Sequence, residues 1–455
     1  MEMVLEFLRD VLSQPALLIG IMSCIGLIAL KRPFHKVMTG TLKPILGYLM
    51  LAAGAGVIVN NLDPLGKMIE HGFHITGVVP NNEAIVAVAQ KVLGVETMSI
   101  LVVGLLMNLC IARFTKFKYV FLTGHHSLFM ACLMSAVLGT AGLSGMELIL
   151  VGGFLMGAWS AISPAIGQSY TSKVTDGDEI AIGHFGSLGY YLSAWVAQYV
   201  GKAEDSTEDI EIPEKWGLLR DSTLSTALTM IVFYLIAAFA AGSEFVATLS
   251  GDMSPYLYAV MSAMNFAVGV AIVYSGVRMI LGDLIPAFQG IATKIIPNAI
   301  PAVDCAVFFT YAPTAVVLGF ISSFIGGIIG MLILGAVGGV LIIPGLVPHF
   351  FCGATAGIYG NATGGRRGAA VGAFLNGLAI TFLPALALPV LGQLGFQNTT
   401  FGDADFAVMG LVLGNAFEWI GMAGIYGVVV IAALVLIIPN FIKTKGKVIN
   451  YVEEE

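Results

Sequence analysis

Long apolar stretches recur along the whole chain and restrict its fold more than any other feature. A helix that crosses a bilayer needs about 20 predominantly apolar residues. Hydrophobic residues make up 57% of the 455 residues and charged residues only 11%, whereas about 25% of a soluble domain is charged. The sequence therefore predicts an all-α polytopic membrane protein with about 11 transmembrane helices. It excludes a soluble enzyme, a nucleic-acid binder, a disordered regulator and a secreted disulfide scaffold. The candidate spans lie at about 15–30, 44–59, 92–112, 119–141, 145–165, 222–245, 256–280, 305–325, 326–345, 368–395 and 406–440.

The cysteines give no sign of a metal or redox site. All five lie in apolar surroundings, and no two have CxxC spacing. We expect them to pack as small hydrophobic side chains, and we expect no metal and no cofactor. The sequence also lacks the GxxxxGK(S/T) pattern of a phosphate-binding loop, which excludes transport driven by its own nucleotide hydrolysis. The cysteines are Cys24, Cys110, Cys132, Cys305 and Cys352.

Basic residues cluster after alternate spans. Cytoplasmic loops carry an excess of lysine and arginine, so the loop after the first span is predicted to be cytoplasmic and the N-terminus external. With eleven spans all of the remaining basic clusters also fall on the cytoplasmic side, and the C-terminus is predicted to be cytoplasmic. The clusters are Lys31, Arg32, Lys36 and Lys43; Arg113, Lys116 and Lys118; Arg278; Arg366 and Arg367; and Lys443, Lys445 and Lys447.

Four segments are too polar or too broken for a span, yet three of them are too apolar for an open loop. They are 60–90, 166–202, 282–304 and 344–365. Irregular backbone at membrane depth is tolerated only where protein or a water-filled cavity surrounds it. We expect a long external segment at 60–90, and re-entrant hairpins or amphipathic surface helices in the others.

Two short echoes indicate an internal repeat. Residues 39–44 are similar to 289–294, and residues 122–125 to 343–345, at offsets of about 250 and 221 residues. Five spans separate the halves, and an odd number inverts the second half, as in transporters that bind substrate near the membrane midplane. The expected division is a first repeat over 1–221, a second over 222–395, and a final span with a cytoplasmic tail over 396–455.

Ionisable side chains at membrane depth are costly and mark candidate functional sites. The sequence Thr123-Gly124-His125-His126 lies near the predicted cytoplasmic start of the fourth span. These imidazoles either sit at the membrane interface or face a ligand. Adjacent residues on a helix point about 100° apart, so we expect at most one of the two to face a site.

Other candidates lie in three places. His184 follows the acidic turn Asp176-Gly177-Asp178-Glu179, which has too few spaced ligands for an EF-hand calcium loop. His184 is either a buried, hydrogen-bonded histidine or a ligand-binding group. Asp304 follows a proline-rich segment and is either a helix cap or a hydrogen-bond acceptor for a ligand. Glu96 and Glu418 lie within predicted spans, where each is a buried partner or part of a crevice.

Sequence blocks along nearly the whole chain resemble those of one family. The blocks are 25–56, 122–125, 174–177, 182–184, 205–213, 287–305, 311–313 and 341–345. In this order they are similar to the ascorbate-type membrane subunit, enzyme IIC, of the bacterial phosphoenolpyruvate-dependent sugar phosphotransferase system.

The resemblance implies an eleven-span homodimer in the bacterial inner membrane, surrounded by lipid and built on inverted repeats. A mobile domain would carry a small sugar-like substrate past a dimer-forming scaffold in an elevator-type motion. A separate IIB subunit with a phosphocysteine would phosphorylate the substrate on delivery, and a IIA subunit would recharge IIB. The residues matched to the family's substrate site are His125, His184 and Asp304, with His125 or His184 as general base. The chain itself is expected to carry no phosphoryl group.

The chain departs from the family pattern around this site. Family members carry glutamines just after both histidines, where this chain has His126-Ser127 and Phe185-Gly186, and a tyrosine-bearing segment reads Asn81-Asn82-Glu83 here. Amides both donate and accept hydrogen bonds, so their loss alters how a polyhydroxy lactone is held. We therefore expect ascorbate or a similar sugar, sugar acid or polyol. The alternative is an ion- or proton-coupled secondary transporter of a small polar solute, with the same groups as a proton relay.

Overall fold

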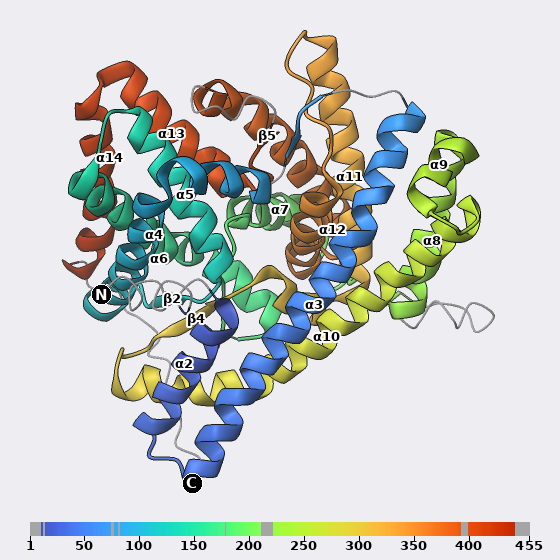
Figure 1. Cartoon of the computed structure of the whole chain (residues 1–455). Coiled ribbons are helices and arrows are strands. Elements are labelled where there is room, and N and C mark those ends of the chain that lie inside the picture. Colours follow the sequence, from blue (N-terminus) through green and yellow to red (C-terminus); the bar gives the residue numbers. More distant parts are fainter. Residues whose placement is uncertain are drawn as a thin grey trace.

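The computed structural model describes residues 11, 14–73, 77–80, 82–177, 179–210, 222–392 and 399–441, and most of them lie in helices (Figure 1). In this part of the chain seven helices are long and apolar enough to cross a membrane, or eight if the bent pair Met230–Ala241 and Ser243–Ser250 forms one span. The chain is therefore an all-α polytopic membrane protein, as predicted. The count of eleven spans stays a prediction.

A first helical group is built around two helices of 40 residues that lie side by side, α3 and α10 (Figure 1). The group consists of α2 (Pro15–Ala29), α3 (Phe34–Phe73), α8 (Ser222–Ala241), α9 (Ser243–Ser250) and α10 (Pro255–Lys294). Gly47 of α3 meets Gly276 of α10, whereas the later Gly54 meets the earlier Gly269, so the two helices run antiparallel. A Cβ at Gly47 would lie 2.8 Å from the carbonyl oxygen of Gly276. Glycines thus allow the close backbone approach that is typical of membrane helices.

A second helical group contains the other helices, and Figure 1 shows several of them gathered on the side away from α8 and α9. They are α4 (Asn82–Phe114), α5 (Gly124–Thr140), α6 (Gly145–Thr175), α7 (Ser187–Val200), α11 (Pro313–Ala336), α12 (Leu346–Gly392), α13 (Ala404–Ile420) and α14 (Met422–Phe441). α12 is two helices joined at a break, because Gly364 and Gly365 leave the helical conformation and Gly365 has a φ of 58°. Glycine adopts this conformation without steric strain.

Short buried strands run through the interior between the helices. β4 (Ile300–Val303) lies between β2 (Tyr119–Phe121) and β3 (Ala181–Ile182), and all three are parallel. The register sets Ala302 opposite both Phe121 and Ala181. Because the strands are parallel, their carboxyl ends lie at the same edge of the small sheet.

In a second set of strands the roles of the two halves of the chain are reversed. β1 (Val79–Pro80) pairs in parallel with β5 (Thr399–Thr400), and Val78 forms a parallel bridge with Ile342. In the first set, one strand from the later half of the chain pairs with two from the earlier half. Here a segment of the earlier half pairs with two from the later half.

Several expected boundaries are wrong. The spans expected at 305–325 and 326–345 are one helix, α11, which begins at Pro313 after a short 3₁₀ helix, η2 (Cys305–Thr310). Proline fits the first turn of a helix, whose N–H groups have no partner in the helix. The stretch at 406–440, by contrast, is long enough for a break, and it is two helices separated by Gly421, whose φ is 62°.

Long helices continue into three of the four irregular segments. α3 continues through Pro64 to Phe73 and α4 begins at Asn82, so little of the external segment expected at 60–90 lies outside helices. α10 likewise continues to Lys294. α6 ends at Thr175, and its cap Asp176 has the left-handed conformation that is typical of helix ends.

Candidate functional site

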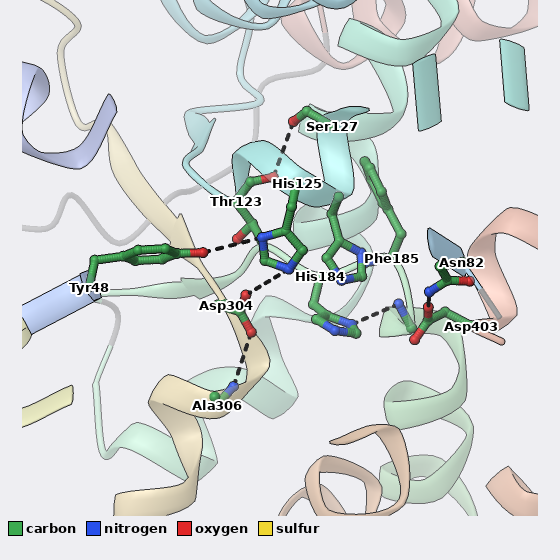
Figure 2. Close-up of polar contacts among 12 residues, drawn as sticks. Tyr48, Asn82, Thr123, His125, Ser127, His184, Phe185, Asp304, Ala306 and Asp403 are labelled. Atoms are coloured by element: carbon green, nitrogen blue, oxygen red, sulfur yellow. Dashed lines mark hydrogen bonds and ion pairs between the residues drawn. The ribbon is translucent and has the colours of Figure 1, made fainter. Parts of the chain in front are cut away.

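The three polar residues singled out from the sequence meet at the carboxyl ends of three parallel strands (Figure 2). β2 leads to His125 in the first turn of α5, β3 leads to His184, and β4 leads to Asp304. Each strand is followed within a few residues by the start of a helix. Polar side chains from three distant parts of the sequence therefore line one cavity.

His125 and Asp304 form the centre of this arrangement. The Nε2 of His125 lies 3.4 Å from Oδ2 of Asp304. The other oxygen, Oδ1, accepts a hydrogen bond of 3.2 Å from the backbone N–H of Ala306 and caps η2. Asp304 is thus a cap, as one of the two alternatives held, and it also presents an oxygen to His125. The Asp304 side chain is 8% exposed and that of His125 is 38% exposed, so the imidazole is the more accessible of the two.

Tyr48 of α3 completes a chain of three polar groups. Its hydroxyl lies 3.2 Å from Nδ1 of His125 (Figure 2). An ionised carboxylate only accepts hydrogen bonds, so ionised Asp304 requires the proton of a neutral His125 on Nε2. Nδ1 is then an acceptor and Tyr48 donates to it. No sequence pattern singles out Tyr48, because a tyrosine in an apolar span is usually part of the core.

His184 is held by donors from its own loop and from α7. Its Nδ1 accepts from the backbone N–H of Gly186 at 3.1 Å and lies 2.8 Å from the hydroxyl of Tyr190. His184 is 4% exposed, so it is a buried histidine with satisfied hydrogen bonds, and it also lines the cavity. With Nδ1 as acceptor, the neutral ring carries its proton on Nε2.

The expectation that at most one of His125 and His126 faces the site is wrong, because both line the cavity. His126 is 3% exposed and its ring centroid lies 3.8 Å from that of His184. Its Nδ1 accepts from the backbone N–H of Phe185 at 3.3 Å. Imidazoles from α5 and from the loop after β3 therefore lie against each other in the cavity wall.

A second polar cluster comes from the other set of strands. Asp403, which precedes α13, accepts from Nδ2 of Asn82 at 2.5 Å and from the thiol of Cys352 at 2.6 Å. The backbone N–H of Gly402 donates to Asn82 at 2.9 Å. Sequence reasoning missed Asp403, although an aspartate immediately before an apolar helix is a recognisable N-cap signal.

Among the residues that the structure describes, two groups of side chains have donor atoms close enough to hold a metal ion. One consists of His184, Asp304 and Cys305, and the other of His184, Cys352 and Asp403. In each group the donor atoms lie within 4.8 Å of one another. Imidazole, thiolate and carboxylate are the ligands that zinc prefers. In the present arrangement, however, Nδ1 of His184 and both oxygens of Asp403 already have hydrogen-bond partners.

The cavity has a volume of about 1180 Å³ and mostly apolar walls. It extends from the two polar clusters along α3 to Phe73 and along α11 to Leu332. Near this end α3 contributes Asp63, Lys67 and Glu70 to the wall, and Lys67 forms an ion pair of 2.8 Å with Asp63. Aimed polar groups on an otherwise apolar wall are typical of sites for small ligands.

Other sequence candidates lie away from the cavity. Glu96 and Glu418 do not line it, and Glu418 is exposed. Asp178 and the side chain of Glu83 fall outside the described residues. The divalent-cation loop therefore stays untested.

Arg366 and Arg367 are exposed at the break in α12. The backbone N–H of Arg366 donates to the carbonyl oxygen of Asp205 at 2.8 Å. Glu208, from the same segment as Asp205, accepts from the N–H groups of Thr314 and Ala315 at the start of α11. The two arginines therefore lie beside the acidic segment that contains Asp205 and Glu208, and hydrogen bonds join this segment to α11 and α12.

Comparisons with known proteins show the family to which the chain belongs. Residues 10–405 match the sequence pattern of the EIIC-GAT family, described as the PTS system sugar-specific permease component. An ascorbate-specific PTS system EIIC component from Mycoplasma pneumoniae is 28% identical, over 78% of this chain and 62% of the relative. The chain thus covers less than two thirds of that relative. Because the family pattern spans most of the chain and includes all of the strands and both polar clusters, the chain belongs to the family of PTS sugar-specific permease components.

Proposed function

We propose that this chain is the membrane subunit of a phosphoenolpyruvate-dependent phosphotransferase system that moves ascorbate or a similar sugar acid or polyol inward. A separate IIB subunit would phosphorylate the substrate on delivery, and IIA would recharge IIB. The observation that carries the proposal is the meeting of His125, His184 and Asp304 on one cavity among membrane-type helices. The named relative supports ascorbate as the first candidate.

The polar groups suit a ligand with several hydroxyls. Asp304 accepts a hydrogen bond from a ligand hydroxyl through Oδ2, because the backbone of η2 binds only the other oxygen, Oδ1. His125 accepts through Nδ1, and His184 donates through Nε2. The second cluster adds the carboxylate of Asp403, which Asn82 orients. Apolar walls around these groups leave few alternative partners for the hydroxyls and thereby fix the orientation of the ligand.

The same geometry supplies a general base for phosphoryl transfer. A substrate hydroxyl oxygen attacks the phosphorus of the IIB phosphocysteine, the O–P bond forms, and the S–P bond breaks with its electron pair leaving on the thiolate. The hydroxyl proton moves to Nδ1 of His125. Asp304, 3.4 Å from Nε2, stabilises the resulting imidazolium. His184 is the less suitable base, because two protein groups already surround its Nδ1, the backbone N–H of Gly186 at 3.1 Å and the hydroxyl of Tyr190 at 2.8 Å.

The proposed fold is an eleven-span homodimer in the bacterial inner membrane with an external N-terminus and a cytoplasmic C-terminus. The reciprocal pairing of strands between the earlier and later halves of the chain supports two inverted repeats. They are divided as 1–221 and 222–395, and the last segment is 396–455. The separation into two helical groups supports an elevator-type motion of the second group past the first. In the predicted topology Phe73 lies at the external end of α3, so the cavity in this conformation opens outward.

An ion- or proton-coupled secondary transporter is the second candidate. The observation that favours it is the pair of buried carboxylates, Asp304 and Asp403. Within the described residues neither forms an ion pair with lysine or arginine. Buried carboxylates within a membrane protein are found in proton relays.

Uptake of radiolabelled ascorbate into vesicles separates the two candidates. Vesicles with phosphorylated IIB should accumulate the phosphate ester, and vesicles without IIB should accumulate nothing. Accumulation of unmodified substrate that follows an imposed proton gradient without IIB would establish the second candidate instead. A panel of sugar acids and polyols, tested by competition in the same vesicles, identifies the substrate.

A further inference from the structure

The surface between the two helical groups is aromatic over much of its described extent. Phe266 of α10 lies edge-on against Phe350 of α12 with ring centroids 5.0 Å apart. Phe233 of α8 contacts Phe320 of α11 at 6.3 Å. Contacts of this kind are non-directional. They therefore allow one group to shift along the other without leaving polar atoms unpaired.

A polar contact also crosses this surface, and it lies at the ligand site. Tyr48 belongs to α3 in the first group, and its partner His125 belongs to α5 in the second. Tyr48 is 6% exposed and lines the cavity. Its position is fixed from behind, because the neighbouring Gly47 packs against the backbone of Gly276 on α10.

We propose that Tyr48 is a latch that holds the second helical group in its present position, and that a bound ligand releases it. This inference rests on the proposed function, because the ligand's hydroxyl must take the place of the Tyr48 hydroxyl at Nδ1 of His125. Nδ1 has one lone pair, so it accepts either the tyrosine or the ligand. Occupancy of the site thereby removes a hydrogen bond between the two helical groups. Tyr48 is thus a positioning residue, coupling binding to movement.

The latch is tested with Tyr48→Phe and with Tyr234→Phe as matched control. Tyr234 is also buried in the first group, but its hydroxyl donates to the backbone oxygen of Asn61 in the same group. Both substitutions remove a tyrosine hydroxyl, but only the hydrogen bond of Tyr48 joins the two groups.

Spin labels report the movement without a ligand. Leu257 on α10 and Val412 on α13 are exposed and lie outside the cavity, so each accepts a cysteine-linked label once Cys24 and Cys110 are alanine. Double electron–electron resonance then gives the distance distribution between the groups. Tyr48→Phe should raise the population of displaced distances about fivefold, the factor that corresponds to one neutral hydrogen bond, and Tyr234→Phe should match the parent. Equal distributions in parent and Tyr48→Phe would overturn the latch.

Ligand binding gives a second readout. Calorimetry with L-ascorbate or D-sorbitol should show about fivefold tighter binding to Tyr48→Phe, since the competing hydroxyl is gone. Weaker binding would mean that Tyr48 contacts the ligand directly, and the latch would be wrong. If neither compound binds the parent while the distance distribution of Tyr48→Phe still shifts, the latch stands and the proposed substrates are wrong.

Discussion

The Nε2 of His125 lies 3.4 Å from Oδ2 of Asp304, although the two residues are far apart in the sequence. They meet because β2 and β4, from different halves of the chain, pair in parallel and end at the same edge. An imidazole and a carboxylate in this relation can bind a hydroxyl and remove its proton.

Asp304→Asn should weaken substrate binding about tenfold. The substitution keeps the size and one acceptor oxygen but removes the charge. Hydrogen bonds to a charged group contribute about 1.5–3 kcal/mol, against about 1 kcal/mol for neutral ones, and 1.4 kcal/mol is tenfold. Calorimetric titration of the purified variant measures the change. Unchanged affinity in a folded variant would reduce Asp304 to the cap of η2.

His125→Gln should slow phosphorylation-dependent uptake at least a hundredfold while weakening binding no more than about tenfold. Glutamine keeps hydrogen-bonding capacity but is not a base, and general base catalysis contributes about 10²–10⁴ in rate. His184→Gln is the matched control and should affect binding and uptake to similar extents. Single-turnover transfer from phosphorylated IIB separates the two steps. A larger rate loss in His184→Gln would move the base to that residue.

Two features of the sequence predicted the most. The long apolar stretches predicted a helical membrane protein, and the free-energy cost of burying ionisable groups in a membrane singled out His125, His184 and Asp304 as candidate site residues. The structure brings all three together. The boundary between 325 and 326 was wrong because one apolar helix runs from Pro313 to Ala336. The boundary at 60 was wrong because a helix does not have to end where hydropathy falls or at a proline. α3, for example, continues through Pro64.

Tyr48 and Asp403 show what sequence reasoning could not reach. Tyr48 joins the site only because α3 packs beside the start of α5, a contact that no local pattern encodes. Asp403 had a local signal as a cap, but its link to Asn82 depends on β1 pairing with β5 across the chain. Parallel pairing between distant strands leaves no trace in the spacing of a single sequence.

Gly47→Ala should destabilise the protein by about 1–3 kcal/mol, the usual cost of overpacking. The added Cβ would lie 2.8 Å from the carbonyl oxygen of Gly276, and backbone cannot move aside cheaply. Gly56→Ala on the same helix is the control, because no atom lies within 4 Å of its added Cβ. Thermal unfolding in detergent compares the two. Equal melting temperatures would show that α3 and α10 can separate without loss.

A reporter fused to the C-terminus should be active in the cytoplasm and inactive in the periplasm. The basic clusters predict this side, because lysine and arginine are retained in cytoplasmic loops. A second fusion directly after Phe73, at the end of α3, should show the opposite result, since the predicted topology puts that end of α3 outside. A periplasmic C-terminus would remove the eleven-span topology.

Arg366 and Arg367 should steer the phosphorylated IIB subunit to the cytoplasmic face. Both are exposed at the break in α12, and the predicted topology puts that break inside. The partner carries a dianionic phosphoryl group, and exposed charges of opposite sign raise association rates. The competing explanation is that the arginines only enforce sidedness, as basic residues do in any membrane protein. The two explanations differ in what happens once the protein is correctly inserted.

Replacement of both arginines with glutamine should leave insertion and substrate affinity intact while slowing IIB-dependent uptake several-fold. Glutamine keeps hydrogen-bonding capacity, so the loss reports the charge. Raising the salt concentration should slow the parent in the same way and the variant much less, because exposed charges are screened within about 8–10 Å at physiological ionic strength. Lys43→Gln is a control on the same predicted side, since Lys43 is already paired with Asp283 at 3.3 Å. If the double variant and the parent show equal uptake at every salt concentration, the arginines serve sidedness and IIB docks elsewhere.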